Sequence, residues 1–290
     1  MISPPYLHVR RQLSPAMYGE VVECNLPNHE EPVAVKCISL TRAADARARI
    51  QGAREIDNPL QEQRVAALLA ANGGHRNVVQ PYLHFVRDET LYLVNELCGD
   101  GDLHSLVAAR VDASTFLTER EVVSLMRQVL EGVCYLHTVL GIAHRDLSLE
   151  NVLLSRGVCK ITDFGLSTDA QIICEGGQVG KEYYMAPEIV AGEHYDPALA
   201  DVWSLGIMWF ILLTGSPLLP LASPSTKGFK AVAQHGVGAV FVSWGHSNRI
   251  SVSSITLLKK MLQIDPRHRI SLSQVLADPL FAAAVTKLLT

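Results

Sequence analysis

The stretch His144–Asn151, which reads His-Arg-Asp-Leu-Ser-Leu-Glu-Asn, constrains this chain more than any other. It follows a long helical pattern, and a strand-like segment at 158–162 leads from it to Asp163-Phe164-Gly165. The oxygens of Asn151 and Asp163 are hard ligands of the kind that Mg²⁺ prefers. Asp146 can accept the proton of a hydroxyl group. Because Asp146 and Asn151 lie five residues apart on one loop, the same piece of backbone would position an attacking group and a metal ion.

This pattern resembles the catalytic loop and metal-binding turn of the eukaryotic protein kinases, H-R-D-x-x-x-x-N followed by D-F-G. The resemblance implies ATP as phosphate donor, Asp146 as the catalytic base, and Asn151 and Asp163 as ligands of Mg²⁺. Phosphoryl transfer suits such residues because it needs positioning and charge neutralisation more than covalent chemistry. The alternative, a polar surface loop, is disfavoured by the spacing of Asn151 and Asp163.

The segment before the first lysine-bearing strand departs from the family pattern G-x-G-x-x-G-x-V, a turn whose backbone amides cover the phosphates. Gly19 and Val21 match the pattern, whereas Ser14 and Ala16 replace its first two glycines. Alone, this stretch would not identify a nucleotide-binding loop, and a plain turn is the alternative. Pro15 removes a donor and stiffens the backbone, so we expect weaker ATP binding than is usual in the family.

The remaining nucleotide-binding residues follow from the resemblance. A strand at 32–36 is similar to the family's V-A-I-K, which implies that Lys36 holds the α- and β-phosphates and that Ala34 lies against adenine. A helix over about 60–71 should carry the glutamate that pairs with Lys36, either Glu62 or, as the alternative, Glu55. The preceding segment 41–60 is polar and basic, and we interpret it as an insertion or an extended helix start.

Two strands at 81–87 and 90–96 should lead into the hinge, where the residues from Glu96 to Cys98 offer backbone groups to adenine. The resemblance adds Leu153 to the nucleotide site. Asp102 would reach the ribose or a basic substrate side chain; a solvated aspartate in a glycine turn is the alternative. Asn95 would close the back of the pocket.

The carboxyl-terminal half carries structural motifs of the same family. Thr118 and Glu121 form a capping box before a long helix. Residues 183–188 match Y-M-A-P-E, and 201–206 match D-x-W-x-x-G. We expect Asp201 to cap the apolar helix that it begins and to brace the catalytic loop. The sequence at 265–269 resembles D-P-x-x-R, which implies an ion pair between Arg269 and Glu188.

One departure concerns charge near the transferred phosphate. Related Ser/Thr kinases read H-R-D-L-K-P-E-N, but the lysine is Ser148 here. The family's threonine in G-T-x-x-Y-M-A-P-E is Lys181. We interpret this as an exchange of ends, in which Lys181 supplies the missing catalytic charge and Ser148 makes room. The alternative is an exposed Lys181 and reduced stabilisation of the phosphate.

A second departure concerns regulation. In the family, the arginine at the position of Arg145 usually pairs with a phosphorylated residue of the activation segment, which corresponds here to residues 163–188. Residues 169–182, in the centre of that segment, contain no Ser, Thr or Tyr. Glu175 is a possible fixed negative charge for Arg145, weaker than a phosphate. We therefore predict that activity does not require phosphorylation in the centre of this segment.

The whole pattern predicts an α+β, two-lobed protein kinase fold in a single domain, 1–290. A small antiparallel sheet with one helix forms the lobe 6–97, and a mainly helical lobe spans 98–290. A hydrophobic content of 48% with 19% charged residues is ordinary for a globular protein. The most apolar stretch, 202–213, is shorter than the ~20 residues that span a bilayer, so we expect a core helix.

Composition also bounds location and partners. The six cysteines form no Cys-x-x-Cys pair, and no signal-peptide pattern opens the chain, which predicts reduced thiols and a cytoplasmic protein. A net charge of −4 argues against nucleic-acid binding, and no membrane partner is expected. The sequence leaves the oligomeric state open.

Three functions compete. The first is an ATP-dependent Ser/Thr kinase acting on protein substrates, favoured because Lys36, Asp146, Asn151 and Asp163 are all present. The second is a pseudokinase or nucleotide-binding scaffold, favoured by the poor glycine loop and the missing loop lysine. A small-molecule kinase is disfavoured by the motifs of the helical half. The loop also lacks the A-A-R or R-A-A pattern of tyrosine kinases.

Overall fold

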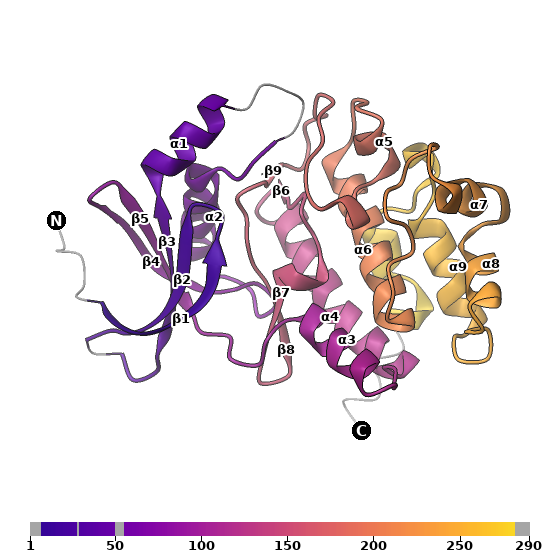
Figure 1. The fold of residues 1–290 in the computed structure, drawn as a ribbon, viewed down its shortest axis with the longest axis horizontal. Coiled ribbons are helices and arrows are strands. Elements are labelled where there is room, and N and C mark those ends of the chain that lie inside the picture. The colour runs from indigo at the N-terminus through magenta and orange to yellow at the C-terminus, as the bar shows by residue number, and fades with distance from the viewer. Residues whose placement is uncertain (1–6, 28, 50–54, 282–290) are drawn as a thin grey trace.

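A five-stranded antiparallel sheet forms the amino-terminal lobe of the computed structural model, which describes residues 7–27, 29–49 and 55–281 (Figure 1). The strand order is β1-β2-β3-β5-β4. The strands are β1 (His8–Ala16), β2 (Gly19–Asn25), β3 (Val33–Ser39), β4 (Pro81–Arg87) and β5 (Thr90–Glu96). Strands β4 and β5 have the predicted bounds, whereas the predicted first strand began at Tyr6, which lies outside the described residues.

Two helices accompany this sheet where one was expected: α1 (Leu40–Arg49) and α2 (Pro59–Ala71). Helix α1 accounts for part of the polar insertion and continues directly from β3, and residues 50–54 of that insertion lie outside the described part. Helix α2 begins where its sequence dictates, because the Asn58 side chain caps it by accepting from the amide of Leu60, and proline at the first helical position needs no donor. Helix α2 packs on β4 and β5.

The second lobe is mainly helical (Figure 1). Its long helix α4 starts at the predicted capping box of Thr118 and Glu121 and ends at Thr138, somewhat before the expected Gly141. The helices are α3 (Leu103–Asp112), α4 (Glu119–Thr138), α5 (Pro187–Val190), α6 (Pro197–Thr214), α7 (Lys227–His235), α8 (Val237–Ser243), α9 (Val252–Met261) and α10 (Leu272–Leu276). Short strands β6 (Ile142–Ala143), β7 (Val152–Ser155), β8 (Val158–Ile161) and β9 (Thr168–Asp169) pair as β6-β9 and β7-β8.

Helix α6 corrects one prediction and confirms another. Its cap is Asp196, whose carboxylate accepts from the amides of Ala198 and Leu199. Asp201 therefore lies inside the helix rather than at its start. The helix is long and apolar enough to cross a membrane, but 89% of it is buried inside the fold, so it is the expected core helix.

A buried ion pair closes the larger lobe. Both Nη atoms of Arg269 contact the carboxylate of Glu188, at 2.6 and 2.9 Å, and both residues are almost fully buried. The Arg269 guanidinium also lies 5.3 Å from the ring centroid of Trp203. The predicted contact between these two motifs is confirmed, and it ties α5 to the chain segment before α10.

Candidate active site

Asp201 braces the catalytic loop through hydrogen bonds to its backbone. Its carboxylate accepts hydrogen bonds from the backbone amides of His144 and Arg145, both at 2.8 Å, and contacts His137 Nε2 at 2.8 Å. Arg145 has a φ of 64°, a left-handed conformation that is uncommon for a residue with a side chain. The carboxylate of Asp201 fixes that strained turn, as the sequence predicted, although it does so from within α6.

Asp146 is oriented by two neighbours. Asn151 Nδ2 donates to the backbone oxygen of Asp146 at 2.7 Å and to its Oδ2 at 2.8 Å. The amide of Lys181 donates to Oδ1 at 3.1 Å. Burial raises the pKa of Asp146 above its ordinary value, while the positive charge of Lys181 opposes that rise. The carboxylate is thus fixed in place and made a stronger base than an exposed aspartate.

Lys36 joins the two lobes. Its Nζ lies 2.8 Å from both carboxylate oxygens of Glu62 and 2.8 Å from Asp163 Oδ1. Burial opposes the charged form of Lys36, but the charges of Glu62 and Asp163 outweigh it and raise the lysine pKa. The predicted pair of Lys36 and Glu62 is confirmed. One ammonium group, carried by β3, thus connects α2 with Asp163.

Asn151 and Asp163 fit a magnesium ion by the chemistry of their donors. Because Asn151 Nδ2 is committed to Asp146, its Oδ1, which accepts a long contact of 3.4 Å from Lys181 Nζ, is the atom that would face a metal ion. Burial opposes the ionised form of Asp163, but the charge of Lys36 outweighs it and lowers the carboxyl pKa. One amide oxygen and one carboxylate suit Mg²⁺, which is usually held by few protein ligands together with substrate phosphates.

Lys181 reaches the position opposite Ser148. Its Nζ lies 2.7 Å from Ser148 Oγ, 3.4 Å from Asn151 Oδ1 and 3.7 Å from Glu150 Oε2. Ser148 is fully buried, so its small side chain leaves room for the lysine head group. An ammonium group therefore stands beside Asp146 and Asn151, although the loop itself has lost its lysine.

Comparison with known proteins agrees with this geometry. Residues 7–281 match the protein kinase domain family. The chain belongs to the protein kinase family. It is 36% identical over 210 residues to probable serine/threonine-protein kinase KCC4 of Saccharomyces cerevisiae, covering 71% of this chain and 19% of that protein. It is 32% identical to calcium-dependent protein kinase 2 of Oryza sativa subsp. japonica, covering 93% of this chain and 50% of that protein. It is 33% identical to serine/threonine-protein kinase PLK4 of Drosophila virilis, over 81% and 28% respectively.

The glycine loop of this protein kinase is a tight hairpin rather than an open turn. Ser14 pairs with Val21 and Ala16 with Gly19 across β1 and β2, leaving two residues at the tip. The lack of a side chain matters at Gly19, because a Cβ there would stand 1.9 Å from the carbonyl oxygen of Cys37. All four residues predicted to cover the phosphates therefore lie within strands, which differs from the expected loop.

The residues predicted to lie beside adenine are on β2, β3, the hinge and β7. Val21 pairs with Lys36, and Ala34 pairs with Asn95. The side chain of Glu96 binds Lys160 at 2.7 Å and the amide of Gln80 at 2.8 Å, and its own amide donates to the carbonyl oxygen of Gln80 at 2.9 Å.

Past β5, Cys98 lies in the connection to α3. Asp102 caps α3 by accepting from the amide of Ser105 at 2.6 Å, and its backbone bridges to Leu153. This capping contact explains an aspartate in that glycine turn without a substrate. Asn95 lines a small cavity with Glu62 and Phe164, which agrees with its predicted place at the back of the pocket.

Two acidic residues of the kinase were not assigned to their observed positions. Glu55 pairs with Arg145 at 2.6 and 2.8 Å, where Glu175 was the predicted partner. Asp57 packs so closely on Gly165 that a Cβ there would lie 3.1 Å from its carboxyl carbon. Burial, then the charge of Asp163, raises the Asp57 pKa to about 6. The sequence carries no signal for either contact, since both depend on how the insertion before α2 folds back.

Proposed function

We propose that this chain is an ATP-dependent protein kinase that transfers the γ-phosphate to Ser or Thr hydroxyls of protein substrates. The observation that carries the proposal is the joint placement of Lys36, Glu62 and Asp163 with Asp146 and Asn151. Each of these side chains performs a separate part of phosphoryl transfer. The relatives named above are Ser/Thr or calcium-dependent protein kinases by name.

Different residues of the chain would carry out different parts of phosphoryl transfer. Asp146 accepts the proton of the substrate hydroxyl, held in place by Asn151 and the amide of Lys181. Lys36 neutralises the phosphates that remain with the nucleotide, and Glu62 orients it. Asn151 and Asp163 would hold Mg²⁺, which supplies charge neutralisation at the phosphate oxygens. The backbone from Glu96 to Cys98 would take adenine, with Val21, Ala34 and Leu153 beside it and Asp102 near the ribose.

Lys181 belongs to this proposal as a catalytic residue. Its ammonium group lies next to Ser148 and Asn151, close to the base. A preorganised positive charge at this place would stabilise the transferred phosphoryl group without reorganisation of solvent. Lys181 thus compensates for the lysine that the family pattern has at the position of Ser148.

A nucleotide-binding scaffold with little or no phosphotransfer is the alternative that the sequence left open. One experiment separates the two: incubation with ATP and Mg²⁺ on a mixed peptide library, comparing the wild type with Asp163→Asn. Phosphate on Ser or Thr that disappears in the variant supports a kinase. No transfer, together with a melting temperature raised by ATP, supports the scaffold.

A cytoplasmic location without nucleic-acid or membrane partners is part of the same proposal. It is supported by six cysteines that are all free thiols and by the net charge of −4. Fractionation of cells that express the full protein tests it.

A further inference from the structure

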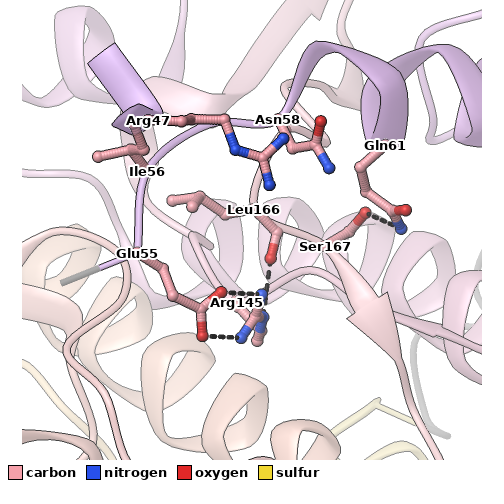
Figure 2. A pocket seen from close by; sticks show the side chains of 9 residues that line it. Arg47, Glu55, Ile56, Asn58, Gln61, Arg145, Leu166 and Ser167 are labelled. Atoms are coloured by element: carbon pink, nitrogen blue, oxygen red, sulfur yellow. Dashed lines mark hydrogen bonds and ion pairs between the residues drawn. The ribbon is translucent and has the colours of Figure 1, made fainter. Parts of the chain in front are cut away.

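The buried guanidinium of Arg145 is fully engaged next to the proposed base. Its Nη atoms contact the Glu55 carboxylate at 2.8 and 2.6 Å, and Nη1 lies 3.0 Å from Tyr195 Oη. Its Nε donates to the backbone oxygen of Leu166 at 2.7 Å (Figure 2). Only 8% of the Arg145 side chain is exposed. Two parallel bonds between a guanidinium and a carboxylate fix geometry as well as charge.

The residues around Glu55 bind the activation segment through their backbone. The Glu55 amide donates to the carbonyl oxygen of Gln178 at 2.9 Å, and the Asn58 amide donates to that of Gly165 at 2.9 Å. Within the first turn of α2, Gln61 Nε2 lies 3.2 Å from Ser167 Oγ (Figure 2). The start of α2 is thereby attached to both ends of the activation segment.

Packing alone does not hold this contact. A cavity of about 270 Å³ adjoins it, lined by Arg47, Glu55, Asn58, Gln61, Arg145 and Ser167 together with Ile56, Gly165 and Leu166. Most of these residues are polar, and 43% of the Glu55 side chain is exposed. The ion pair and the backbone bonds, together with Ile56, which packs against the core of the smaller lobe, therefore keep the segment in place.

The centre of the activation segment offers no substitute for Glu55. Residues 169–182 contain no hydroxyl that a kinase can phosphorylate, and Arg145 contacts Glu55 rather than Glu175. We infer that Glu55 is a positioning residue that takes the place of an activation-segment phosphate, holding Arg145 and α2 in their working arrangement without phosphorylation. This inference rests on the proposed kinase function and adds how that function is switched on.

Glu55 is connected to the proposed catalytic residues in two ways. Arg145 directly precedes Asp146, and α2 carries Glu62, the partner of Lys36. Loss of the carboxylate leaves a buried guanidinium without its charge partner, which favours rearrangement of the loop. A displacement of about 1 Å at a reacting group can lower a rate about a hundredfold. Glu55→Gln should therefore reduce kcat.

The experiment compares Glu55→Gln with Glu31→Gln. Glu31 is matched because it also makes a 2.8 Å pair with an arginine, Arg156, but both side chains are exposed. We expect kcat to fall about tenfold to a hundredfold in Glu55→Gln, with a smaller change in KM for ATP, and to stay unchanged in Glu31→Gln. Glu55→Asp should recover part of the loss. Phosphatase treatment of the wild type should leave its kcat unchanged.

A double-mutant cycle with Arg145→Gln distinguishes positioning from a general loss of stability. If Glu55 acts through Arg145, then Glu55→Gln has little further effect on kcat once Arg145 is replaced. Additive losses, an unchanged kcat in Glu55→Gln, or inactivation of the wild type by phosphatase would each overturn the inference.

Amide hydrogen exchange gives a readout that does not need activity. Glu55→Gln should speed exchange at Asn58, whose amide is bonded to Gly165, while leaving α4 unchanged. If the wild type is active but exchange is unaltered in Glu55→Gln, the positioning role is contradicted and the kinase function is not. A wild type without transfer contradicts the kinase function, and exchange then still decides whether the ion pair holds α2.

Discussion

The ammonium group of Lys181 lies 2.7 Å from the hydroxyl of Ser148, across 33 residues of sequence. In related kinases the loop position of Ser148 holds a lysine and the opposite position a threonine. Here the larger and smaller side chains have changed places, and the contact between the two segments persists. The charge is thus delivered by the activation segment rather than by the catalytic loop.

Replacing Lys181 with methionine should lower kcat by about tenfold to a hundredfold, because a positive charge next to the transferred phosphate is lost. Steady-state kinetics on the preferred peptide measure this. The double variant Ser148→Lys with Lys181→Thr restores the family arrangement and should recover activity that Lys181→Thr alone loses. An unchanged kcat in Lys181→Met would mean that the amine is only a surface group.

Asp57 should make stability depend on pH. Its folded pKa of about 6 lies above the ordinary value of 3.8, so the unfolded chain ionises first as pH rises. The contribution of this carboxyl group to the stability of the folded state is therefore fully present below pH 3.8, where both states are protonated. It is lost as pH rises through about 6, where the folded state must also ionise. Asp57→Asn should stabilise the protein by about 1–2 kcal/mol at pH 7.5, with the gain shrinking toward pH 4.

Thermal denaturation of Asp57→Asn between pH 4 and 8 tests this. Asp88→Asn is the control, since Asp88 is an exposed turn residue and its replacement should give no comparable gain. A stability difference that stays constant over the pH range would contradict the assignment to the Asp57 carboxyl group.

Glu188→Gln should destabilise the larger lobe by about 3–5 kcal/mol, because it leaves the guanidinium of Arg269 buried without a counter-charge. The Arg269 side chain is 0% exposed, and its partner is 2% exposed. Urea denaturation at constant pH measures the effect. Arg267→Gln, which removes an exposed arginine from its pair with Asp265, should leave the midpoint unchanged; equal midpoints for both variants would refute the prediction.

Asp201→Asn should lower kcat more than tenfold and cost about 1–3 kcal/mol of stability. An amide keeps one acceptor oxygen, whereas Asp201 accepts from the amides of His144 and Arg145 and contacts His137. Kinetics and urea denaturation measure the two effects. Asp196→Asn is the matched control, because asparagine caps a helix as well as aspartate does. Equal effects of the two variants would mean that Asp201 has no special role.

The motifs allowed the central site to be predicted because each one carries its own geometry. The contacts of Lys36 with Glu62 and of Glu188 with Arg269 follow from short patterns at fixed places in a shared fold. The predicted cap of α6 was wrong because Asp201 is an acceptor for the loop, while Asp196, just before a proline, has the usual capping position. The partner of Arg145 was also predicted wrongly, since Glu55 lies in an insertion with no pattern of its own.

The second helix of the smaller lobe was missed for a related reason. Only Ala43 is buried in residues 40–49, with Leu40 and Ala46 packed beside it. This short apolar face, made mostly of alanine, was overlooked among the charged residues. The position of this helix is decided by attachment to the end of β3. The hairpin at Ala16–Gly19 likewise depends on the register of two strands, which local composition does not specify.

The buried pair of Glu188 and Arg269 also has a consequence for synthesis on the ribosome. Its two members are separated by 81 residues, which take about 4 to 16 seconds to translate. During that time Glu188 has no Arg269 to pair with, so its carboxylate cannot be buried as it is in the folded lobe. The amino-terminal sheet, whose strands all precede residue 97, can form earlier. The larger lobe therefore completes its folding only after Arg269 has emerged, and this interval is when nascent chains of this protein should depend most on chaperones.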